Sequence, residues 1–176
     1  MSAKRRIAEQ APIVASSHLI SEGGWKLSEL EFGLIIANNA FSRWVVRCAA
    51  AAGVKDLSAL DVLVLHNINH RTREKTLADI CFMLNVEDAH VVKYAVKKLM
   101  NAGLAAATRR GKETRYATTA RGRAACQKYR DVREQCLIGP LQSLRGAASV
   151  DLRACATLLR ALSGVYDQAA RTASSF

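Results

Sequence analysis

The sequence contains few residues that break or cross-link a fold. Only two of its 176 residues are proline and half are hydrophobic, so we expect the chain to be folded over most of its length. The cysteines are odd in number and include no Cys-x-x-Cys pair: Cys48, Cys81, Cys126, Cys136 and Cys155. This pattern argues against a disulfide framework or a zinc ribbon, and it predicts small buried thiols in a reducing compartment.

Long apolar runs are also absent. The longest candidate stretches are interrupted by Asn38, Asn39, Ser42 and Arg43, so none approaches the roughly 18 residues of a membrane span. The basic N-terminus has no continuous apolar segment of signal-peptide length. These absences predict a cytoplasmic protein with no membrane partner.

Nothing in the sequence has the spacing of a catalytic or cofactor site. Its 15 acidic residues are dispersed, Gly23 and Gly24 lead to no phosphate-binding loop, and serine, histidine and aspartate form no recognisable triad. His66 and His70 could share a helix face, but no acidic third ligand stands at a fixed spacing from them. We therefore predict a protein that is not an enzyme and that holds no cofactor or metal.

Positive charge, by contrast, is abundant and unevenly distributed. The chain has 26 lysines and arginines against 15 acidic residues, a net charge of +11. Between Lys93 and Arg133 there are twelve lysines and arginines but only two acids, so this segment alone carries +10. Such a concentration favours an anionic partner such as nucleic acid.

Apolar periodicity and capping signals predict that the first half of the chain is helical. Residues 1–24 are expected to form an arm or a short leading helix. Ser28 with Glu31 has the spacing of a capping box, and the apolar pattern then continues as one helix to about Ala52. A second helix is expected after Ser58, with these residues facing inward: Leu60, Leu63, Val64 and Ile68.

A helix-turn-helix is expected next. Thr76, with Asp79 three residues on, has the pattern of a capped start for a short helix. After a polar turn, a longer helix is predicted over about residues 89–102, and Gly103 stands at its C-cap position. Two short helices joined by a tight turn make this motif.

The pattern then changes to a β-hairpin over about residues 104–118. Two short extended pieces flank the polar tip 109–113, and this hairpin would form a wing beside the helix-turn-helix. The predicted fold class is therefore mainly α with a small β-hairpin wing. We interpret it as a winged helix-turn-helix with additional helices at both ends.

Two further helices are expected in the last third of the chain. Thr119 can cap the first, which runs until Gly139 and Pro140 bend or break it. The last helix is rich in leucine and is expected to run from Ser149 to about Arg171.

The predicted helix 89–102 has one apolar and one polar face. Val92, Val96 and Leu99 follow helical spacing and should face the core. An α-helix fits the major groove of DNA, and its exposed residues can reach base edges while flanking cations meet phosphates. The predicted DNA contacts of this helix are His90, Lys93 and Tyr94 for bases, and Lys97 and Lys98 for the backbone.

The predicted wing is strongly basic. It carries four cations against one acid: Arg109, Arg110, Lys112 and Arg115. A wing of this charge beside a helix-turn-helix would lie along neighbouring phosphates or in the minor groove, where an arginine senses groove width. We therefore predict that double-stranded DNA is the partner.

These residues resemble the winged-helix core of the MarR family of transcriptional regulators. The resemblance covers residues 76–125 closely. It is carried by Leu77-Ala78, by the run from Lys98-Leu99 to Gly103-Leu104, by the charged wing and by the segment from Thr119 to Gly122. Two departures point to a divergent branch: the turn before the recognition helix is one residue longer than usual, and the wing tip lacks the Asp-x-Arg-Arg pattern.

The resemblance implies a homodimer that regulates transcription. Its N-terminal arm and dimerisation helix would occupy residues 1–56, its DNA-binding lobe 57–119 and its C-terminal dimerisation helices 120–176. Unpaired, the first and last helices would be too apolar for a small lobe, which agrees with this expectation.

The resemblance also implies a small-molecule effector pocket between the dimerisation helices and the DNA-binding lobe. Trp25, Trp44 and His66 are the candidates to line it. A thiol sensor is an alternative form of control, for which Cys126 is the candidate because cations stand near it in sequence. The alternative to a DNA regulator is a non-enzymatic helical interaction module that binds RNA or an acidic protein.

Overall fold

The computed structural model describes His18, residues 24–143 and residues 151–176, and it divides into two compact units, Met1–Arg130 and Asp131–Phe176. The arm expected before Gly24 and the helix start expected at Ser149 lie outside the described residues. We describe each unit by itself.

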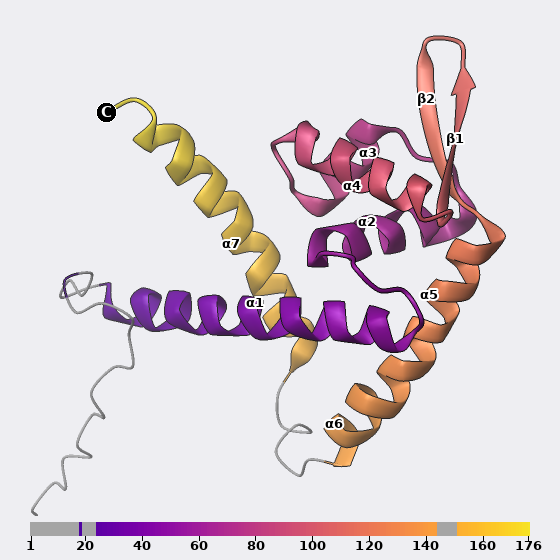
Figure 1. Ribbon diagram of the computed structural model, residues 1–176. Coiled ribbons are helices and arrows are strands. Elements are labelled where there is room, and N and C mark those ends of the chain that lie inside the picture. Colours follow the sequence, from indigo (N-terminus) through magenta and orange to yellow (C-terminus); the bar gives the residue numbers. More distant parts are fainter. Residues whose placement is uncertain (1–17, 19–23, 144–150) are drawn as a thin grey trace, which may run out of the picture. The chain divides into compact units, whose positions relative to one another are not determined.

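The first unit contains five helices and one hairpin in the described residues (Figure 1). Their bounds are α1 (Trp25–Ala51), α2 (Ala59–Asn69), a single 3₁₀ turn (His70–Thr72), α3 (Leu77–Leu84), α4 (Ala89–Asn101), β1 (Ala105–Arg110), β2 (Glu113–Thr118) and α5 (Ala120–Arg133). The last three residues of α5 belong to the second unit. The observed architecture is mainly helical with a two-stranded antiparallel hairpin, as the sequence predicts.

Helix α1 begins earlier than the sequence analysis predicts. Its N-cap is Gly24, which has no side chain to accept a hydrogen bond, and Ser28 lies inside the helix, where its backbone N–H donates to the Gly24 carbonyl at 3.0 Å. The capping box expected at Ser28 and Glu31 is therefore wrong. The local pattern is present, but the chain is already helical at Trp25, so no free N–H group is left there to cap.

Helix α2 begins as predicted, and its burial is wider than predicted. The Ser58 hydroxyl accepts from the Asp61 N–H at 3.2 Å, and the Asp61 carboxylate accepts from the Ser58 N–H at 2.7 Å, which is a complete capping box. Val62, Val64, Leu65 and Ile68 are buried, whereas Leu60 and Leu63 are half-buried. This helix contacts α1, α3, α4 and β2, so more than one of its faces is covered.

Helices α3 and α4 form the expected helix-turn-helix. Thr76 and Asp79 make a second complete capping box at the start of α3, and Asn85 ends this helix in the left-handed conformation. The Asp88 side chain caps α4 by accepting from the His90 N–H at 2.8 Å. Gly103 follows α4 with a φ of +68°, a conformation that favours glycine.

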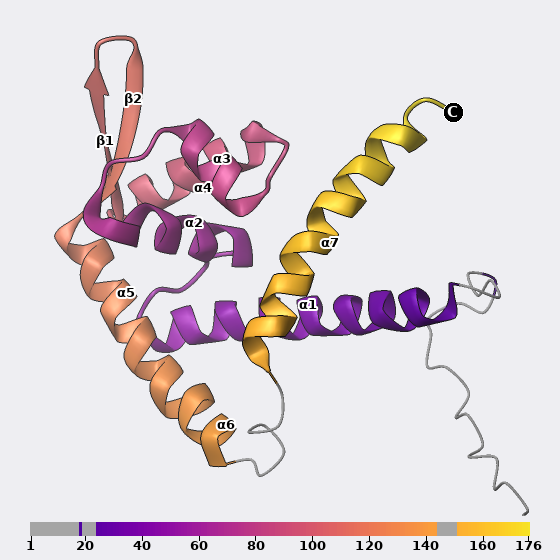
Figure 2. The same cartoon turned by 180° about the vertical axis from the view of Figure 1, so that it is seen from behind.

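The hairpin lies where the sequence predicts it, but its strands are longer and its turn is shorter than expected. The strands pair from Ala105 with Thr118 to Arg110 with Glu113, so the turn consists of Gly111 and Lys112 alone. Gly111 has a φ of +62°, as the first residue of a tight two-residue hairpin turn requires. Both views show the hairpin projecting away from α2, α3 and α4 (Figures 1 and 2).

Thr119 and Gly122 join the base of the hairpin to α5. The Thr119 hydroxyl accepts from the Gly122 N–H at 3.0 Å and donates to the Gly103 carbonyl at 2.7 Å, so the predicted cap is confirmed. A Cβ on Gly122 would stand 2.0 Å from the Leu104 carbonyl oxygen. The close approach of α5 to the start of β1 therefore needs a glycine at this position.

The core of the first unit lies around α2 and α4. Its buried hydrophobic residues are Val45, Ala49, Leu57, Val62, Val64, Leu65, Ile68, Ile80, Val92, Ala95, Val96, Leu99, Leu104, Ala105, Ala125 and Cys126. These residues come from every element of this unit except the 3₁₀ turn and β2, so the helix-turn-helix, the start of the wing and α5 share one core.

The second unit is helical and has almost no interior of its own. After α5, a π-helical turn (Glu134–Ile138) leads directly into α6 (Gly139–Ser143), so Gly139 and Pro140 do not end the helical path there. The last helix, α7 (Leu152–Ala173), is capped by Asp151, whose carboxylate accepts from the Arg153 and Ala154 N–H groups. No described residue from Asp131 onward is buried.

The structure tests two expectations from composition: buried cysteines and the absence of a membrane-spanning helix. Cys48 and Cys126 are buried and Cys81 is half-buried, as expected, but Cys136 and Cys155 are exposed, so the expectation of buried thiols is wrong for these two. Among the described residues, no helix has both the length and the apolar character that crossing a membrane requires.

Candidate nucleic-acid interface

Helix α4 presents the polar face that the sequence predicts. Val92, Val96 and Leu99 are buried in the core, and the opposite face is exposed: Ala89, His90, Lys93, Tyr94 and Lys97. Tyr94 is 69% exposed although it is a large aromatic residue. An exposed helix face with two lysines, a histidine and an unsupported aromatic ring has the composition of a surface that binds a polyanion.

Lys98 lies apart from this exposed face. Its ammonium group is 2.9 Å from the carboxylate of Asp61, and the Asp61 side chain is only 5% exposed. Asp61 is also part of the capping box of α2. Lys98 therefore joins α4 to the start of α2, and its charge is balanced within the protein.

The four cations of the wing differ in whether an acid of this chain neutralises them. Arg110 bonds through Nε to the carboxylate of Glu74 at 3.1 Å, and Arg115 bonds through Nη2 to Glu113 at 2.8 Å. Arg109 donates through Nε to a backbone oxygen, the Gly111 carbonyl, at 3.3 Å, and Lys112 is exposed in the turn. Two of the four predicted wing contacts are thus held by acids of this chain.

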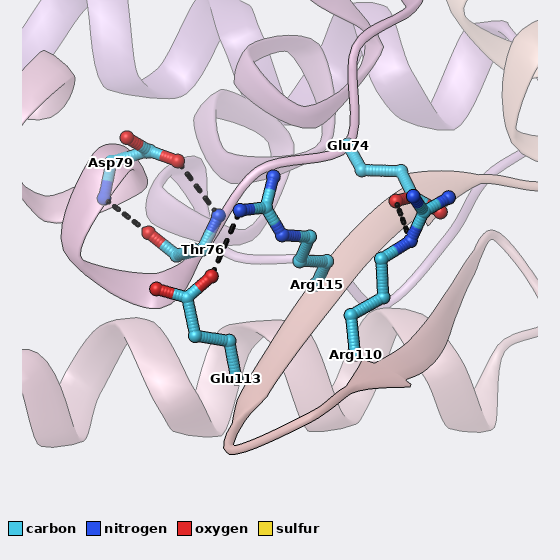
Figure 3. A network of polar contacts seen from close by, with 6 residues as sticks. All are labelled: Glu74, Thr76, Asp79, Arg110, Glu113 and Arg115. Atoms are coloured by element: carbon cyan, nitrogen blue, oxygen red, sulfur yellow. Dashed lines mark hydrogen bonds and ion pairs between the residues drawn. The ribbon is translucent and has the colours of Figure 1, made fainter.

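A network of polar groups connects the wing to the start of α3 (Figure 3). Hydrogen bonds from Thr76 lower the pKa of Asp79, and the charges of Arg73 and Arg115 lower it further. The Arg115 guanidinium lies beside this cap and also contacts Glu113 (Figure 3). The side chains of the wing are therefore tied to the helix-turn-helix as well as to one another.

The segment before α3 is the part of the interface that sequence reasoning missed. Lys75 forms an isolated β-bridge with Tyr116, with backbone hydrogen bonds of 3.0 and 2.8 Å, so this residue lies directly beside β2 of the wing. Arg71 and Arg73, in the same segment, are exposed. The signal in the sequence is a run of cations directly before the cap at Thr76, and none of them is among the contacts predicted from the sequence.

Lys75 itself is a buried cation with a structural role. Its ammonium group donates to the carbonyl oxygens of Asn67 and His70, the latter at 2.7 Å, at the C-terminal end of α2. Burial lowers the pKa of Lys75, and the charges of Arg73 and Arg71 contribute. A cation here satisfies carbonyls that the helix end leaves without partners.

A small cavity lies between α1, α2 and α5. It encloses about 230 Å³, part of it open to solvent, and is lined by Ala49, Ala52, Val54, Leu57, Val62, Leu65, His66, Ala125, Cys126 and Tyr129. His66 packs edge-on against Tyr129 with ring centroids 4.4 Å apart, and burial lowers the pKa of His66. Of the predicted pocket residues, His66 lines this cavity, whereas Trp25 and Trp44 are half-buried elsewhere.

The geometry bears on the two other kinds of sensor considered from the sequence. Burial raises the pKa of Cys126 to about 11, so its thiol is protonated at neutral pH and is a poor redox sensor. His66 lies within α2 but His70 caps its end in an extended conformation, so the two do not share a helix face. The described residues contain no group of three potential metal ligands.

Comparison with known proteins supports the same domain. Residues 57–122 match the family of winged helix DNA-binding domains, which spans α2, the helix-turn-helix, the wing and the start of α5. No curated protein matches the chain in sequence.

Solved structures of transcriptional regulators have a similar fold. MosR of M. tuberculosis, solved in complex with DNA, has a TM-score of 0.58 and 18% identity over 76% of this chain and 96% of its own. A mutant of MarR from E. coli has a TM-score of 0.53 and 19% identity over 84% of this chain and 97% of its own. BpsR of Bordetella bronchiseptica, whose DNA binding is regulated by 6-hydroxynicotinic acid, has a TM-score of 0.50 and 21% identity over 72% of this chain and 98% of its own.

At these identities the similarity shows the fold alone. Residues 57–122 match the winged helix DNA-binding domain family, and the chain has a fold similar to that of MarR-family transcriptional regulators.

Proposed function

We propose that this protein is a transcriptional regulator that binds a specific sequence of double-stranded DNA as a homodimer. Helix α4 enters the major groove, and the β1–β2 wing lies on the adjacent backbone or in the minor groove. The observation that carries the proposal is the exposed polar face of α4 beside a basic hairpin, within a domain that matches DNA-binding winged helices.

The roles of individual residues follow from exposure and pairing. His90, Lys93 and Tyr94 are near the N-terminal end of α4, where a helix in the major groove reaches base edges. Lys97, Arg109 and Lys112 are exposed and contact phosphates in this proposal. Lys98 serves mainly to hold α4 against α2, because its ammonium group is already paired with Asp61.

The homodimer is supported by apolar surface that the described residues leave uncovered. One side of α7 carries exposed hydrophobic residues at helical spacing: Leu152, Leu158, Leu159, Val165 and Tyr166. Ile35, Ile36 and Phe41 of α1 are exposed as well. A second copy of the chain would bury such faces, and a two-fold dimer would present two α4 helices to a palindromic site.

A small-molecule effector is a further part of the proposal. The DNA binding of BpsR is regulated by 6-hydroxynicotinic acid, and we propose the cavity at His66 and Tyr129 as the effector site of this chain. The 230 Å³ includes space that is open to solvent, and the cavity itself has room for about one water molecule, so an effector would have to widen it.

The proposal is tested by selecting bound sequences from random duplex DNA with the purified protein. The best site and a scrambled duplex are then titrated over a series of salt concentrations. We expect a dyad-symmetric site, bound at least about a thousandfold more tightly than the scramble, with affinity that falls steeply as salt rises. Lys93→Ala should abolish most of this preference.

A lack of preference between the two duplexes would contradict the proposal. If both duplexes bind weakly with the same shallow dependence on salt, the protein is not a specific DNA regulator. Tighter binding to RNA or to an acidic protein would then favour the helical interaction module.

A further inference from the structure

Glu74 is the acid that restrains a wing cation from outside the wing. It lies between α2 and α3, directly before Lys75, whose backbone pairs with Tyr116 of β2. Its carboxylate accepts from Arg110 at 3.1 Å. The two side chains differ in exposure: that of Arg110 is 67% exposed and that of Glu74 is 28% exposed. The acid is therefore held by a bridged backbone, while the arginine is on the outside.

The pairing register of the hairpin separates Arg110 from Arg109. Residues that face each other across an antiparallel pair project to the same side, and neighbours along a strand project to opposite sides. Arg110 therefore shares a side with Glu113, Thr108 and Arg115, which is the side of the acidic contacts (Figure 3). Arg109 shares the other side with Thr114. Of these two arginines, Arg110 has a carboxylate partner among the described residues and Arg109 has none.

We infer that Glu74 is a specificity-determining residue that holds Arg110 away from phosphate when the protein is on non-specific DNA. The inference rests on the proposed function, because it concerns how the same interface discriminates between DNA sequences. In this role Glu74 does not touch bases. It orients the wing through Arg110 and removes one cation from the sequence-independent attraction to the backbone.

The physical basis is a competition between two anions for one guanidinium. Non-specific binding is almost wholly electrostatic, and each additional cation on the backbone adds one phosphate contact. If Arg110 moves to a phosphate, the Glu74 carboxylate stays behind because the next residue, Lys75, is held to Tyr116 by two backbone hydrogen bonds. The carboxylate then stands unpaired close to the negatively charged DNA. The repulsion between this unpaired carboxylate and the DNA weakens a non-specific complex most, because such a complex has few other contacts.

On the specific site, the competition between Glu74 and phosphate for Arg110 has a different outcome. The wing is positioned there by the base contacts of α4, and Arg110 remains with Glu74, so the ion pair contributes to the orientation of the hairpin. Removal of the carboxylate should then raise affinity for random DNA and change affinity for the specific site little. The measurable consequence is a lower ratio of specific to non-specific affinity.

The test is the variant Glu74→Gln, measured against the selected site and a scrambled duplex over a salt series. We expect affinity for the scramble to rise about two- to fivefold, as for loss of an exposed ion pair, and its salt slope to steepen by about one phosphate contact. Affinity for the specific site should change less than twofold, by the same reasoning.

Two control variants separate this effect from simpler ones. Glu29→Gln removes the same charge at an exposed position of α1, and it should leave both affinities nearly unchanged. Arg110→Ala removes the partner, so Glu74→Gln should have no effect on scramble binding when added to it. Thermal unfolding of each variant checks that the fold is retained.

The outcomes are distinguishable from failure of the proposed function. If the unmodified protein shows no preference for any duplex, the proposed function fails and takes the inference with it. If it is selective but Glu74→Gln changes neither affinity, or raises both equally, the specificity role of Glu74 is wrong while the function stands. A gain that persists in the Arg110→Ala background also overturns the inference.

Discussion

Single residues in this protein often owe their identity to a contact that is close in space. Gly122 is one case, because the backbone of α5 passes the Leu104 carbonyl too closely for any side chain. His66 is another, because it is enclosed by apolar side chains and the ring of Tyr129. Both residues can be tested by changes at one position.

Gly122→Ala should destabilise the first unit. The added methyl would stand 2.0 Å from the Leu104 oxygen, so α5 or the start of β1 must move. The expected loss in the free energy of unfolding is about 1–3 kcal/mol or more, measured by urea denaturation. Gly33→Ala is the matched control: nothing lies within 4 Å of its added methyl, and the change should stabilise α1 by up to about 1 kcal/mol. Equal effects of the two substitutions would contradict the packing described here.

Acid should destabilise the first unit through His66. Burial lowers the pKa of this histidine below its ordinary value of 6.5, so below that pH the unfolded chain binds more protons than the folded one. Stability should therefore be complete above about pH 6.5 and decline as the pH falls toward the lowered pKa. Thermal unfolding over this range should show the decline in the native protein and in His90→Gln, but less of it in His66→Phe. An unchanged decline in His66→Phe would assign the effect to another group.

At the scale of elements, α4 has two neighbouring lysines with different roles. The ammonium group of Lys98 pairs with the buried carboxylate of Asp61 and connects α4 with α2. Lys97 is exposed on the opposite side of the helix from the core. In α4, the charge of Lys98 therefore fixes the position of the helix on α2, and the charge of Lys97 is exposed to solvent.

The variants Lys97→Met and Lys98→Met should separate these roles. Lys98→Met leaves the Asp61 carboxylate buried without its partner, and it should lower stability by about 1–3 kcal/mol. Lys97→Met should leave stability nearly unchanged and weaken binding to all duplexes, with a shallower salt slope. Denaturation and DNA titration of both variants provide the test, and a stability loss confined to Lys97→Met would reverse the assignment.

Capping signals were the most dependable guide to the elements, because they act within three residues of the chain. The helix start at Ser58, the capped start at Thr76 with Asp79 and the cap at Thr119 are all present as predicted. The same pattern at Ser28 was misleading, because nothing in those four residues reports that the chain is already helical before them. The length of the hairpin turn was also misjudged: Arg109, Arg110 and Glu113, expected in the tip, are part of the paired strands.

For the whole molecule, the main feature that calls for a partner is the exposed hydrophobic side of α7. Leu158 and Leu159 are about half exposed in this chain, and no described residue of the second unit is buried. A helix with this much uncovered hydrophobic surface needs a partner to be stable in water. The proposed homodimer provides that partner.

Charged substitutions on α7 test the homodimer. Leu158→Glu combined with Leu159→Glu would place two carboxylates in a buried interface, which should convert the dimer to monomer or abolish folding of α7. Gln168→Glu is the control: its side chain lies 2.9 Å from Arg171, so added charge is balanced there. Sedimentation equilibrium should give a dimer for the native protein and the control. A monomeric native protein would contradict the proposal.

The sequence by itself determined the elements and the chemistry of their surfaces. Helical periodicity, the three caps at Ser58, Thr76 and Thr119, and the run of cations from Lys93 onward are local features, so they survive in any environment of the chain. Only the tertiary structure decided which of the predicted cations remain available. The pairs Lys98–Asp61 and Arg110–Glu74 join residues far apart in the chain, and their charges meet only because α2, α4 and the wing pack on one core.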